Sequence, residues 1–516
     1  MSDTKTGMSR LTKRNLFTFS IGTIGRDAAC AGLFMGNILN YVYFTKRLDA
    51  TQFAVLTVIM AVARIFDAFN DPIMGNIIDA TKSRFGKFKP WIAIGMVTSA
   101  VVVYFSFANN LQGWAYVTFF SLMYFAFSIT FTMNDIAYWG MIPSLARNAA
   151  DRDKLTSLTV FFAGIGGGVC GILLPILTTG DLAIGGSAVS AYRVTAVLFV
   201  AIFIVLQSVT LIGVKEDRSH AVPTEKVSLK GIIKTYRQND QLRWISLAFF
   251  CTQFIPTAAL TMYIYFQFGY NGTLLTLFYT FSSLGTIVVN LSYPKLSKRF
   301  SRQGLVKMAW ICMMIGGAGL LAIGILFPNQ TVSFTIPFFN ATITLKYFLM
   351  ALLYFFVGFA QTATYMSHMV CIANTTEYND YKFGKRSEGM IFATRPFVTK
   401  LGNALNTLIV MLFYIVIGVN SETNRIADLE QQANIGTITA EQKLSSIGEL
   451  INGIAPFKIY ALLALVVFCT VGTYTIAYFI FKKKYFIDEA YFEKMSVEIE
   501  ERNAVAETEE AEAITE

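Results

Sequence analysis

Residues 63–91 read ARIFDAFNDPIMGNIIDATKSRFGKFKPW, an apolar run that carries one arginine and three aspartates and ends in a basic turn. An ionised side chain in hydrocarbon costs at least about 2.5 kcal/mol, so each one needs a partner or a function. Lysines and arginines gather in cytoplasmic loops of membrane proteins. The stretch therefore predicts a membrane helix that holds a polar site and ends on the cytoplasmic side.

The composition of the whole chain supports a membrane protein. Of its 516 residues, 54% are apolar and only 15% are charged, and the mean hydropathy is +0.52. Soluble proteins carry about 25% charged residues and need polar atoms over much of their surface. This composition excludes a soluble enzyme, and apolar runs along the whole length exclude a secreted domain with one anchor.

Apolar runs of membrane-spanning length predict twelve transmembrane helices in an all-α membrane protein. The predicted spans are 17–44, 52–79, 90–109, 114–143, 154–179, 192–214, 241–268, 273–293, 304–327, 345–373, 389–419 and 456–481. With both termini in the cytoplasm, 31 lysines and arginines lie inside and 7 outside, which fixes the orientation in an inner (plasma) membrane. The net charge of +9 then follows from topology and requires no nucleic acid.

A polar stretch after the sixth span divides the chain into two halves of six helices, which suggests a parallel repeat. The predicted domains are an N-terminal six-helix bundle (1–214), a cytoplasmic central loop (215–240), a C-terminal six-helix bundle (241–481) and a cytoplasmic acidic tail (482–516). The outer loop 420–455 is long and is expected to hold an interfacial helix, to which no role is assigned.

The cysteines and the N-terminus carry no processing signal. All six cysteines lie inside apolar runs, so neither a disulfide framework nor a metal cluster is expected. The first apolar run continues to Phe44 without a small-residue cleavage site, which indicates a retained helix rather than a signal peptide.

The charges within the spans fall at one depth. Counted from the inner ends of their helices, they lie about 12 to 18 Å into the membrane at 1.5 Å per residue. These residues are Asp27 with its neighbour Arg26, Asp67, Asp71, Asp135 and Lys400. Charges from four helices in one layer form a plausible site.

Asp67 and Asp71 are four residues apart and share one helix face, where two carboxylates can hold a cation or a proton between them. Pro72 frees the backbone carbonyl four residues earlier, which adds an oxygen suited to a hard cation. Thr132 and Asp135 are three apart and can face the same pocket. The alternative is a buried ion pair, because Arg64 lies three residues before Asp67 and can neutralise it.

Sugars are bound by carboxylates and basic groups that hydrogen-bond their hydroxyls and by an aromatic face that covers the ring. Asp27, Asp135, Arg26 and Lys400 supply the polar groups, and Trp139, four residues after Asp135, supplies a ring. Core packing or contact with lipid is the competing interpretation of Trp139 alone.

Enzymatic readings are poorly supported. The only histidines are His220 and His368, too few for a histidine-based metal site or triad, and the chain contains no phosphate-binding G-x-x-x-x-G-K-[ST] loop. No cofactor is expected. Energy for transport would come from an ion gradient.

The stretch 63–91 resembles the motif of the glycoside-pentoside-hexuronide:cation symporter family of the major facilitator superfamily. Further matching motifs are GTIGRDAA (22–29), TMNDIAYWGMIPSL (132–145), TTEYNDYKFGKRSEG (375–389) and FVTKLGNAL (397–405). The resemblance covers nearly all of the predicted spans. It implies the major facilitator fold of two six-helix bundles and coupling of sugar movement to Na⁺ or H⁺.

Carried over position by position, the resemblance implies three groups of site residues. The cation ligands are Asp67, Asp71 and Thr132, with Asp135 between cation and sugar. The sugar contacts are Arg26, Asp27, Asp135, Trp139 and Lys400. The inner gate comprises Arg84, Arg152, Glu377, Asp380, Arg386 and Glu388.

Two positions depart from the family pattern. Val160 stands where the family's melibiose carrier has a sugar-contacting arginine in the fifth span, which argues against a galactoside. Asn374 stands where that carrier has an aspartate at the end of the tenth span, which alters the inner gate.

We therefore expect a secondary active transporter that carries a sugar or glycoside with a cation by alternating access, functioning as a monomer in the bilayer. The main alternative is a carrier of lipids, lysolipids or other amphiphiles with the same fold. A sugar receptor would bind without transport and would be expected to carry an output domain. A channel would show unsaturable flux, and no repeated pore segment supports one.

Overall fold

The structure is a computed structural model that describes residues 12–146, 149–215, 229–327, 333–336, 341–385 and 387–515. The chain forms two compact units. The first comprises Met1–Thr224, Ile264–Thr276 and Leu408–Lys458, and the second comprises Glu225–Tyr263, Leu277–Thr407 and Ile459–Glu516.

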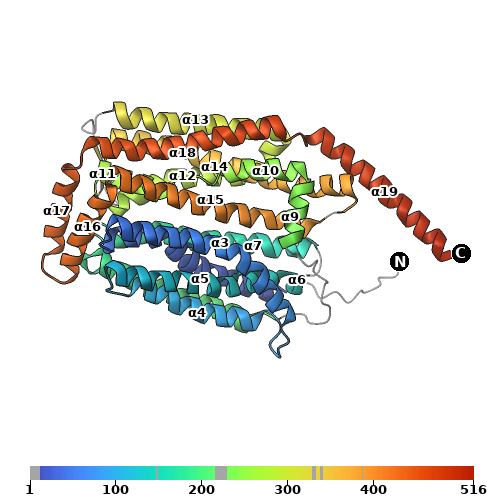
Figure 1. The fold of residues 1–516 in the computed structure, drawn as a ribbon, viewed down its shortest axis with the longest axis horizontal. Coiled ribbons are helices and arrows are strands. Elements are labelled where there is room, and N and C mark those ends of the chain that lie inside the picture. Colours follow the sequence, from blue (N-terminus) through green and yellow to red (C-terminus); the bar gives the residue numbers. More distant parts are fainter. Residues whose placement is uncertain are drawn as a thin grey trace. The chain divides into compact units, whose positions relative to one another are not determined.

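The first unit is helical, and its long helices run alongside one another (Figure 1). In chain order they are α1 (Lys13–Arg26), the π-helical segment η1 (Asp27–Met35), α2 (Gly36–Thr45), α3 (Ala50–Ala80), α4 (Lys89–Phe107), α5 (Gly113–Gly140), α6 (Ile142–Leu145), α7 (Ala149–Thr178), the short 3₁₀ segment η2 (Ile184–Gly186), α8 (Ala188–Gly213), α16 (Val419–Asn434) and α17 (Ala440–Asn452). The beginnings of these helices follow sequence signals. Asp49 and Gln52 form a capping box at the start of α3, and Ser187 caps α8.

The second unit holds the remaining helices and one small hairpin. They are α9 (Leu229–Gln238), α10 (Asp240–Cys251), α11 (Thr257–Phe268), α12 (Gly272–Arg299), α13 (Arg302–Leu326), α14 (Leu345–Phe383), α15 (Glu388–Ile417), α18 (Pro456–Lys484) and α19 (Glu489–Thr515), with the antiparallel strands β1 (Ser333–Ile336) and β2 (Ala341–Thr344). The end of α11, the start of α12, the end of α15 and the first residues of α18 belong to the first unit. The two strands were not expected from the sequence.

The prediction of an all-helical membrane fold is confirmed, with two of the predicted spans interrupted. Within the described residues, ten helices are long and apolar enough to cross a membrane. The predicted span 17–44 is divided into α1, η1 and α2, and the predicted span 241–268 is divided into α10 and α11, which have 12 residues each. A single 12-residue helix extends only about 18 Å, so α10 and α11 would cross a bilayer only as a pair. Pro256, directly before α11, lacks the N–H that a continuous helix would need.

Close helix packing in the first unit depends on glycine. Gly166 of α7 lies so near the backbone of α1 that a Cβ there would overlap the carbonyl oxygen of Ile24. A Cβ on Gly25 would come within 2.6 Å of the Cα of Phe203 on α8. Small residues let membrane helices approach closely, which gains packing where no hydrophobic force separates helix from lipid. These contacts hold α1, which carries Arg26, against α7 and α8.

The loop between α15 and α18 forms a hairpin of two helices, α16 and α17, rather than a single interfacial helix. The hairpin packs on the first unit, where Glu430 accepts a hydrogen bond from the backbone N–H of Ala188 at 2.6 Å. Lys443 lies 3.2 Å from Glu430 and donates to the carbonyl of Gly186 at 2.8 Å. Burial raises the pKa of Glu430, and Lys443 opposes this shift. This ion pair is thus a buried link between the two hairpin helices and the start of α8.

Further hydrogen bonds fasten the hairpin to the loop after α2. Asn424 accepts from the backbone N–H of Leu48 and donates to its carbonyl at 2.7 Å, while Gln431 donates to the carbonyl of Thr45 at 2.7 Å. The Arg47–Asp428 ion pair at 2.8 Å adds a contact at the surface. The hairpin is therefore a folded part of the first unit, although it lies between two helices that begin or end in the second.

The second unit packs around α14. Trp310 of α13 stacks on Tyr478 of α18 with ring centroids 4.6 Å apart, and His368 of α14 is fully buried among aromatic rings. The tail helix α19 docks on the same unit, with Met495 fully buried. Arg502 of α19 forms an ion pair with Asp380 of α14 at 2.5 Å.

We expect Gly166→Ala to lower the stability of the folded protein by about 1–3 kcal/mol, because the added methyl group must displace the α1 backbone. The loss should appear as a lower melting temperature of the purified protein in detergent.

Gly167→Ala is the matched control for Gly166→Ala. A Cβ at Gly167 meets nothing within 4 Å, so this variant should melt at or above the wild-type temperature. Equal melting temperatures for the two variants would contradict the proposed packing of α7 on α1.

Lys443→Met should destabilise the protein by about 3–5 kcal/mol, because it leaves the Glu430 carboxylate buried without its partner. Replacing both residues, in Glu430→Gln with Lys443→Met, should recover part of that loss. Arg47→Met removes an exposed pair, with side chains 53% and 44% accessible, and should cost less than about 1 kcal/mol. Thermal unfolding of the four proteins checks this order, and an equal effect of Lys443→Met and Arg47→Met would refute it.

Candidate substrate and cation site

The predicted site residues of the first unit lie on α1, η1, α3 and α5. Arg26 is the last residue of α1, and Asp27 is the first residue of the π-helical segment η1. Single π-helical turns within helices are frequent at functional sites, because the extra residue per turn redirects the side chains. The change of helix type at 26–27 therefore separates the directions of these two neighbouring charges.

Arg26 links two carboxylates from different helices. Its guanidinium lies 3.2 Å from Asp27 and 3.1 Å from Asp135 of α5, although the arginine is only 2% exposed. The same guanidinium lies over the rings of Tyr138 and Trp139, at 5.0 and 5.4 Å from their centroids. A buried charge needs pairing of this kind, and aromatic faces add cation–π attraction.

Trp139 completes this group as the sequence analysis expected. Its indole N–H donates to the carboxylate of Asp135 at 3.0 Å, one turn earlier on the same helix. The Asp135 side chain keeps 36% of its surface accessible, so it can still accept bonds from a ligand. Arg26, Asp27, Asp135 and Trp139 thus form one polar cluster with an aromatic wall, which we call the sugar cluster.

Two carboxylates on α3 meet two hydroxyls on α5 to form a second group. Asp71 accepts a hydrogen bond from Thr132 at 3.3 Å, as the prediction of a shared cation site required. Asp67 accepts a hydrogen bond from Ser128, a residue that the sequence analysis did not single out. We call Asp67, Asp71, Ser128 and Thr132 the cation cluster.

Arg64 lies at the edge of the cation cluster. Its guanidinium is 3.8 Å from the second carboxylate oxygen of Asp67 and lies over the ring of Tyr124 at 5.9 Å. A distance of 3.8 Å is an ion pair without a hydrogen bond. The neutralising contact that was the alternative to a cation site is therefore present, beside an Asp67 oxygen that the Ser128 hydroxyl already contacts.

Helix α5 connects the two clusters. It carries Ser128 and Thr132 toward α3, and Asp135 and Trp139 toward Arg26. Asn134 anchors this helix by exchanging two amide hydrogen bonds of 2.9 Å with Gln207 of α8 and donating to the Ile92 carbonyl of α4. Because α5 is held at Asn134, a shift at Thr132 would be transmitted to Asp135 three residues later.

The remaining predicted residues lie elsewhere. Lys400 is half-buried on α15 in the second unit. In the predicted inner gate, Arg84 lies over Phe85 at 4.7 Å and Arg152 donates to the carbonyl of Ala146 at 2.9 Å. Glu377 and Asp380 lie on α14, and Glu388 is the first residue of α15. Arg386 lies outside the described residues.

Asp380 has a partner that the sequence analysis did not foresee, Arg502 of the tail helix. The gate assignment stays a prediction.

Ser128 and Tyr138 are the site residues that sequence reasoning missed. A signal for Ser128 existed, because it precedes Thr132 by one turn just as Asp67 precedes Asp71. Tyr138 stacks on Phe19 with centroids 4.4 Å apart and supports Arg26 from beneath. Among 24 tyrosines nothing in the sequence marked it.

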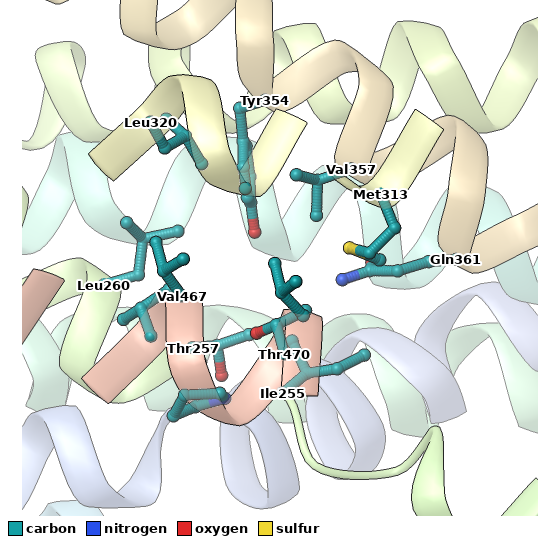
Figure 2. A pocket seen from close by; sticks show the side chains of 14 residues that line it. Ile255, Thr257, Leu260, Met313, Leu320, Tyr354, Val357, Gln361, Val467 and Thr470 are labelled. Carbon is teal, nitrogen blue, oxygen red and sulfur yellow. The ribbon is translucent and has the colours of Figure 1, made fainter. Parts of the chain in front are cut away.

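The second unit contains a small apolar cavity between α11, α13, α14 and α18 (Figure 2). Figure 2 shows the hydroxyl of Tyr354 and the amide of Gln361 directed into it. The cavity leaves about 10 Å³ for a water-sized sphere, which is enough for about one water molecule and too little for a sugar ring. It is therefore not a sugar site.

The chain resembles known sugar carriers over most of its length. It is 27% identical over 495 residues to the lactose permease of Lactobacillus delbrueckii subsp. bulgaricus, with 92% of this chain and 70% of the permease covered. It is 26% identical to the raffinose carrier protein of Pediococcus pentosaceus, with 78% and 62% covered. It is 24% identical to the putative glycoside/cation symporter YagG of Escherichia coli K12, with 78% and 83% covered. The chain spans between 56% and 70% of the length of the lactose permeases and raffinose carrier that it matches.

Solved structures show the same fold at low sequence identity. A bacterial homolog of the human lysosomal transporter Spinster, in an inward-facing and occupied conformation, matches with a TM-score of 0.52 and 11% identity, covering 91% of this chain and 97% of that one. The nucleoside transporter NupG matches with a TM-score of 0.50 and 11% identity, covering 87% and 98%. These matches confirm the major facilitator fold.

The sequence pattern of one family settles the membership. The pattern of the family described as MFS/sugar transport protein matches residues 19–442, most of the chain. The chain therefore belongs to the MFS/sugar transport protein family and is an integral membrane transporter of sugars, not an enzyme.

Proposed function

We propose that this transporter is a symporter, in which a neutral sugar or glycoside binds at the sugar cluster and Na⁺ or H⁺ binds at the cation cluster. The observation that carries the proposal is that one helix, α5, supplies groups to both clusters. Thr132 contacts Asp71, and three residues later Asp135 contacts Arg26. Relatives named as a glycoside/cation symporter and as lactose and raffinose carriers support the same substrate class.

Coupling follows from the electrostatics of the cation cluster. Two carboxylates one turn apart repel each other, and a bound cation or proton removes that repulsion. The relaxed position of α5 then favours the arrangement of Asp135 that binds sugar. By thermodynamic linkage the sugar strengthens cation binding by the same factor, commonly worth about 1–3 kcal/mol.

The charge of the sugar cluster favours a neutral ligand. Asp27 and Asp135 bring two negative charges against the single positive charge of Arg26. A hexuronide would place a third carboxylate beside them, at an electrostatic cost in a low-dielectric site. We therefore place neutral glycosides and pentosides ahead of hexuronides, and Val160 argues against a simple galactoside.

Transport by alternating access of two six-helix bundles completes the proposal. The chain works as a monomer with both termini in the cytoplasm, Lys400 beside both clusters, and Arg84, Arg152, Glu377, Asp380, Arg386 and Glu388 closing the inner side. The domain boundaries at 214, 240 and 481 belong to this proposal.

Uptake into proteoliposomes tests the function directly. Labelled lactose, a pentoside and a glucuronide are offered under a Na⁺ gradient and, separately, under a H⁺ gradient. Accumulation of a neutral sugar under one gradient supports the proposal and names the ion. No accumulation of any sugar by folded protein, together with transport of a lysolipid analogue, would favour an amphiphile carrier.

Asp71→Asn should abolish gradient-driven accumulation while exchange of sugar across the membrane persists, because the amide cannot take up the charge of the cation. Asp79→Asn is the matched control on the same helix, since Asp79 pairs with Lys87 at the surface at 2.8 Å. The control should accumulate sugar normally. Full accumulation by Asp71→Asn would overturn the cation assignment.

Trp139→Phe should raise the apparent KM for sugar about tenfold, because it keeps a ring face but removes the bond that orients Asp135, and a hydrogen bond to a charged group contributes about 1.5–3 kcal/mol. The measurement is initial uptake over a range of sugar concentrations. Trp91→Phe removes an indole bond to Thr81 outside the cluster and should leave KM unchanged. The same KM in both variants would contradict a role for Trp139 in binding.

A further inference from the structure

The side chain of Ser128 departs from the usual behaviour of hydroxyls in this protein's helices. Buried serines and threonines normally bond to the carbonyl four residues earlier. Ser121 on the same helix does this, donating to the Val117 carbonyl at 2.6 Å, and Thr57 does the same with Phe53. Ser128 instead donates to the carboxylate of Asp67 on α3, and it is only 6% exposed.

Two matched pairs join α3 and α5. The pairs Asp67–Ser128 and Asp71–Thr132 both join residues 61 positions apart in the sequence, one helical turn from each other. Both hydroxyls therefore face the same strip of α3 as the two carboxylates. Thr132 does not act alone, because Ser128 places a second neutral oxygen against the pair.

We propose that Ser128 is a ligand of the coupling cation and makes the cation cluster select an alkali-metal ion, Na⁺, over the proton. This inference rests on the proposed function, because it assigns a further residue to the same site. A hydroxyl that donates its hydrogen to a carboxylate keeps its oxygen lone pairs for a cation. Hard cations such as Na⁺ favour several oxygen ligands, whereas a proton needs only one carboxylate oxygen.

Ser128 also positions Asp67. One carboxylate oxygen receives the Ser128 hydroxyl and the other faces Arg64 at 3.8 Å. The hydroxyl thereby orients the carboxylate on the side that faces α5. Its removal should weaken Na⁺ binding both by losing a ligand and by freeing Asp67 to turn toward Arg64.

The test is Na⁺ titration of Ser128→Ala. We expect the Na⁺ concentration for half-maximal sugar binding to rise at least tenfold, while sugar accumulation driven by a H⁺ gradient stays within twofold of wild type. Na⁺ should also raise the melting temperature of the wild type but not of the variant, because a ligand stabilises the folded state in proportion to its binding. Ser128→Thr restores a hydroxyl and should restore the Na⁺ response.

Two controls keep the result interpretable. Ser121→Ala removes a hydroxyl from the same helix that bonds only to its own backbone, so its Na⁺ response should be that of wild type. Ser128→Cys keeps the side-chain volume but replaces the oxygen, so it should behave as Ser128→Ala even where the smaller residue impairs folding.

The outcomes separate this inference from the proposed function. An unchanged Na⁺ response in Ser128→Ala and Ser128→Cys, with accumulation lost in Asp71→Asn, overturns the role of Ser128 alone. A wild-type protein that responds to H⁺ and not to Na⁺ also overturns it. Accumulation that survives in Asp71→Asn instead overturns the cation site itself.

Discussion

Charge is costly inside a bilayer, and the first unit of this protein places its buried charges around one guanidinium. Arg26 is almost fully enclosed, and it is tolerated there because Asp27 and Asp135 lie within 3.2 Å and two aromatic rings cover its face. The pairing requires that α1 and α5 approach closely. Glycines at the crossings of α1 with α7 and α8 allow this approach, so the packing of the unit and the polarity of its site depend on each other.

The same arrangement explains how two ligands can influence each other across a short distance. Helix α5 is fixed by the amide pair of Asn134 and Gln207, and it presents hydroxyls to α3 and a carboxylate to α1 on either side of that point. A rigid element contacted by both sites is the physical requirement for coupling. Neither site needs to touch the other, because the helix connects them.

Much of this could be predicted from the sequence, and the failures have physical reasons. Ionised residues are rare in apolar runs, so Arg26, Asp27, Asp67, Asp71 and Asp135 stand out against their surroundings. Ser128 and Tyr138 do not, because hydroxyls and aromatic rings are tolerated everywhere in a membrane helix. Hydropathy also does not register the π-helical turn at Asp27 or the break before Pro256, since both lie within continuous apolar runs. The hairpin of α16 and α17 depends on hydrogen bonds to the carbonyls of Thr45 and Leu48, which leave no pattern in side-chain chemistry.

The hairpin has a consequence for how this transporter can be taken apart. Its residues come from the second half of the chain, but Glu430 and Lys443 are satisfied by the backbone of Ala188 and Gly186 in the first half. A chimera made by joining the first half of this chain to the second half of a relative would therefore bring a foreign hairpin to these anchor points. Likewise, the first half expressed as a separate fragment would expose the surface that the hairpin normally covers. The two halves are continuous in sequence at the central loop, but the smallest piece that keeps this surface covered includes residues from both.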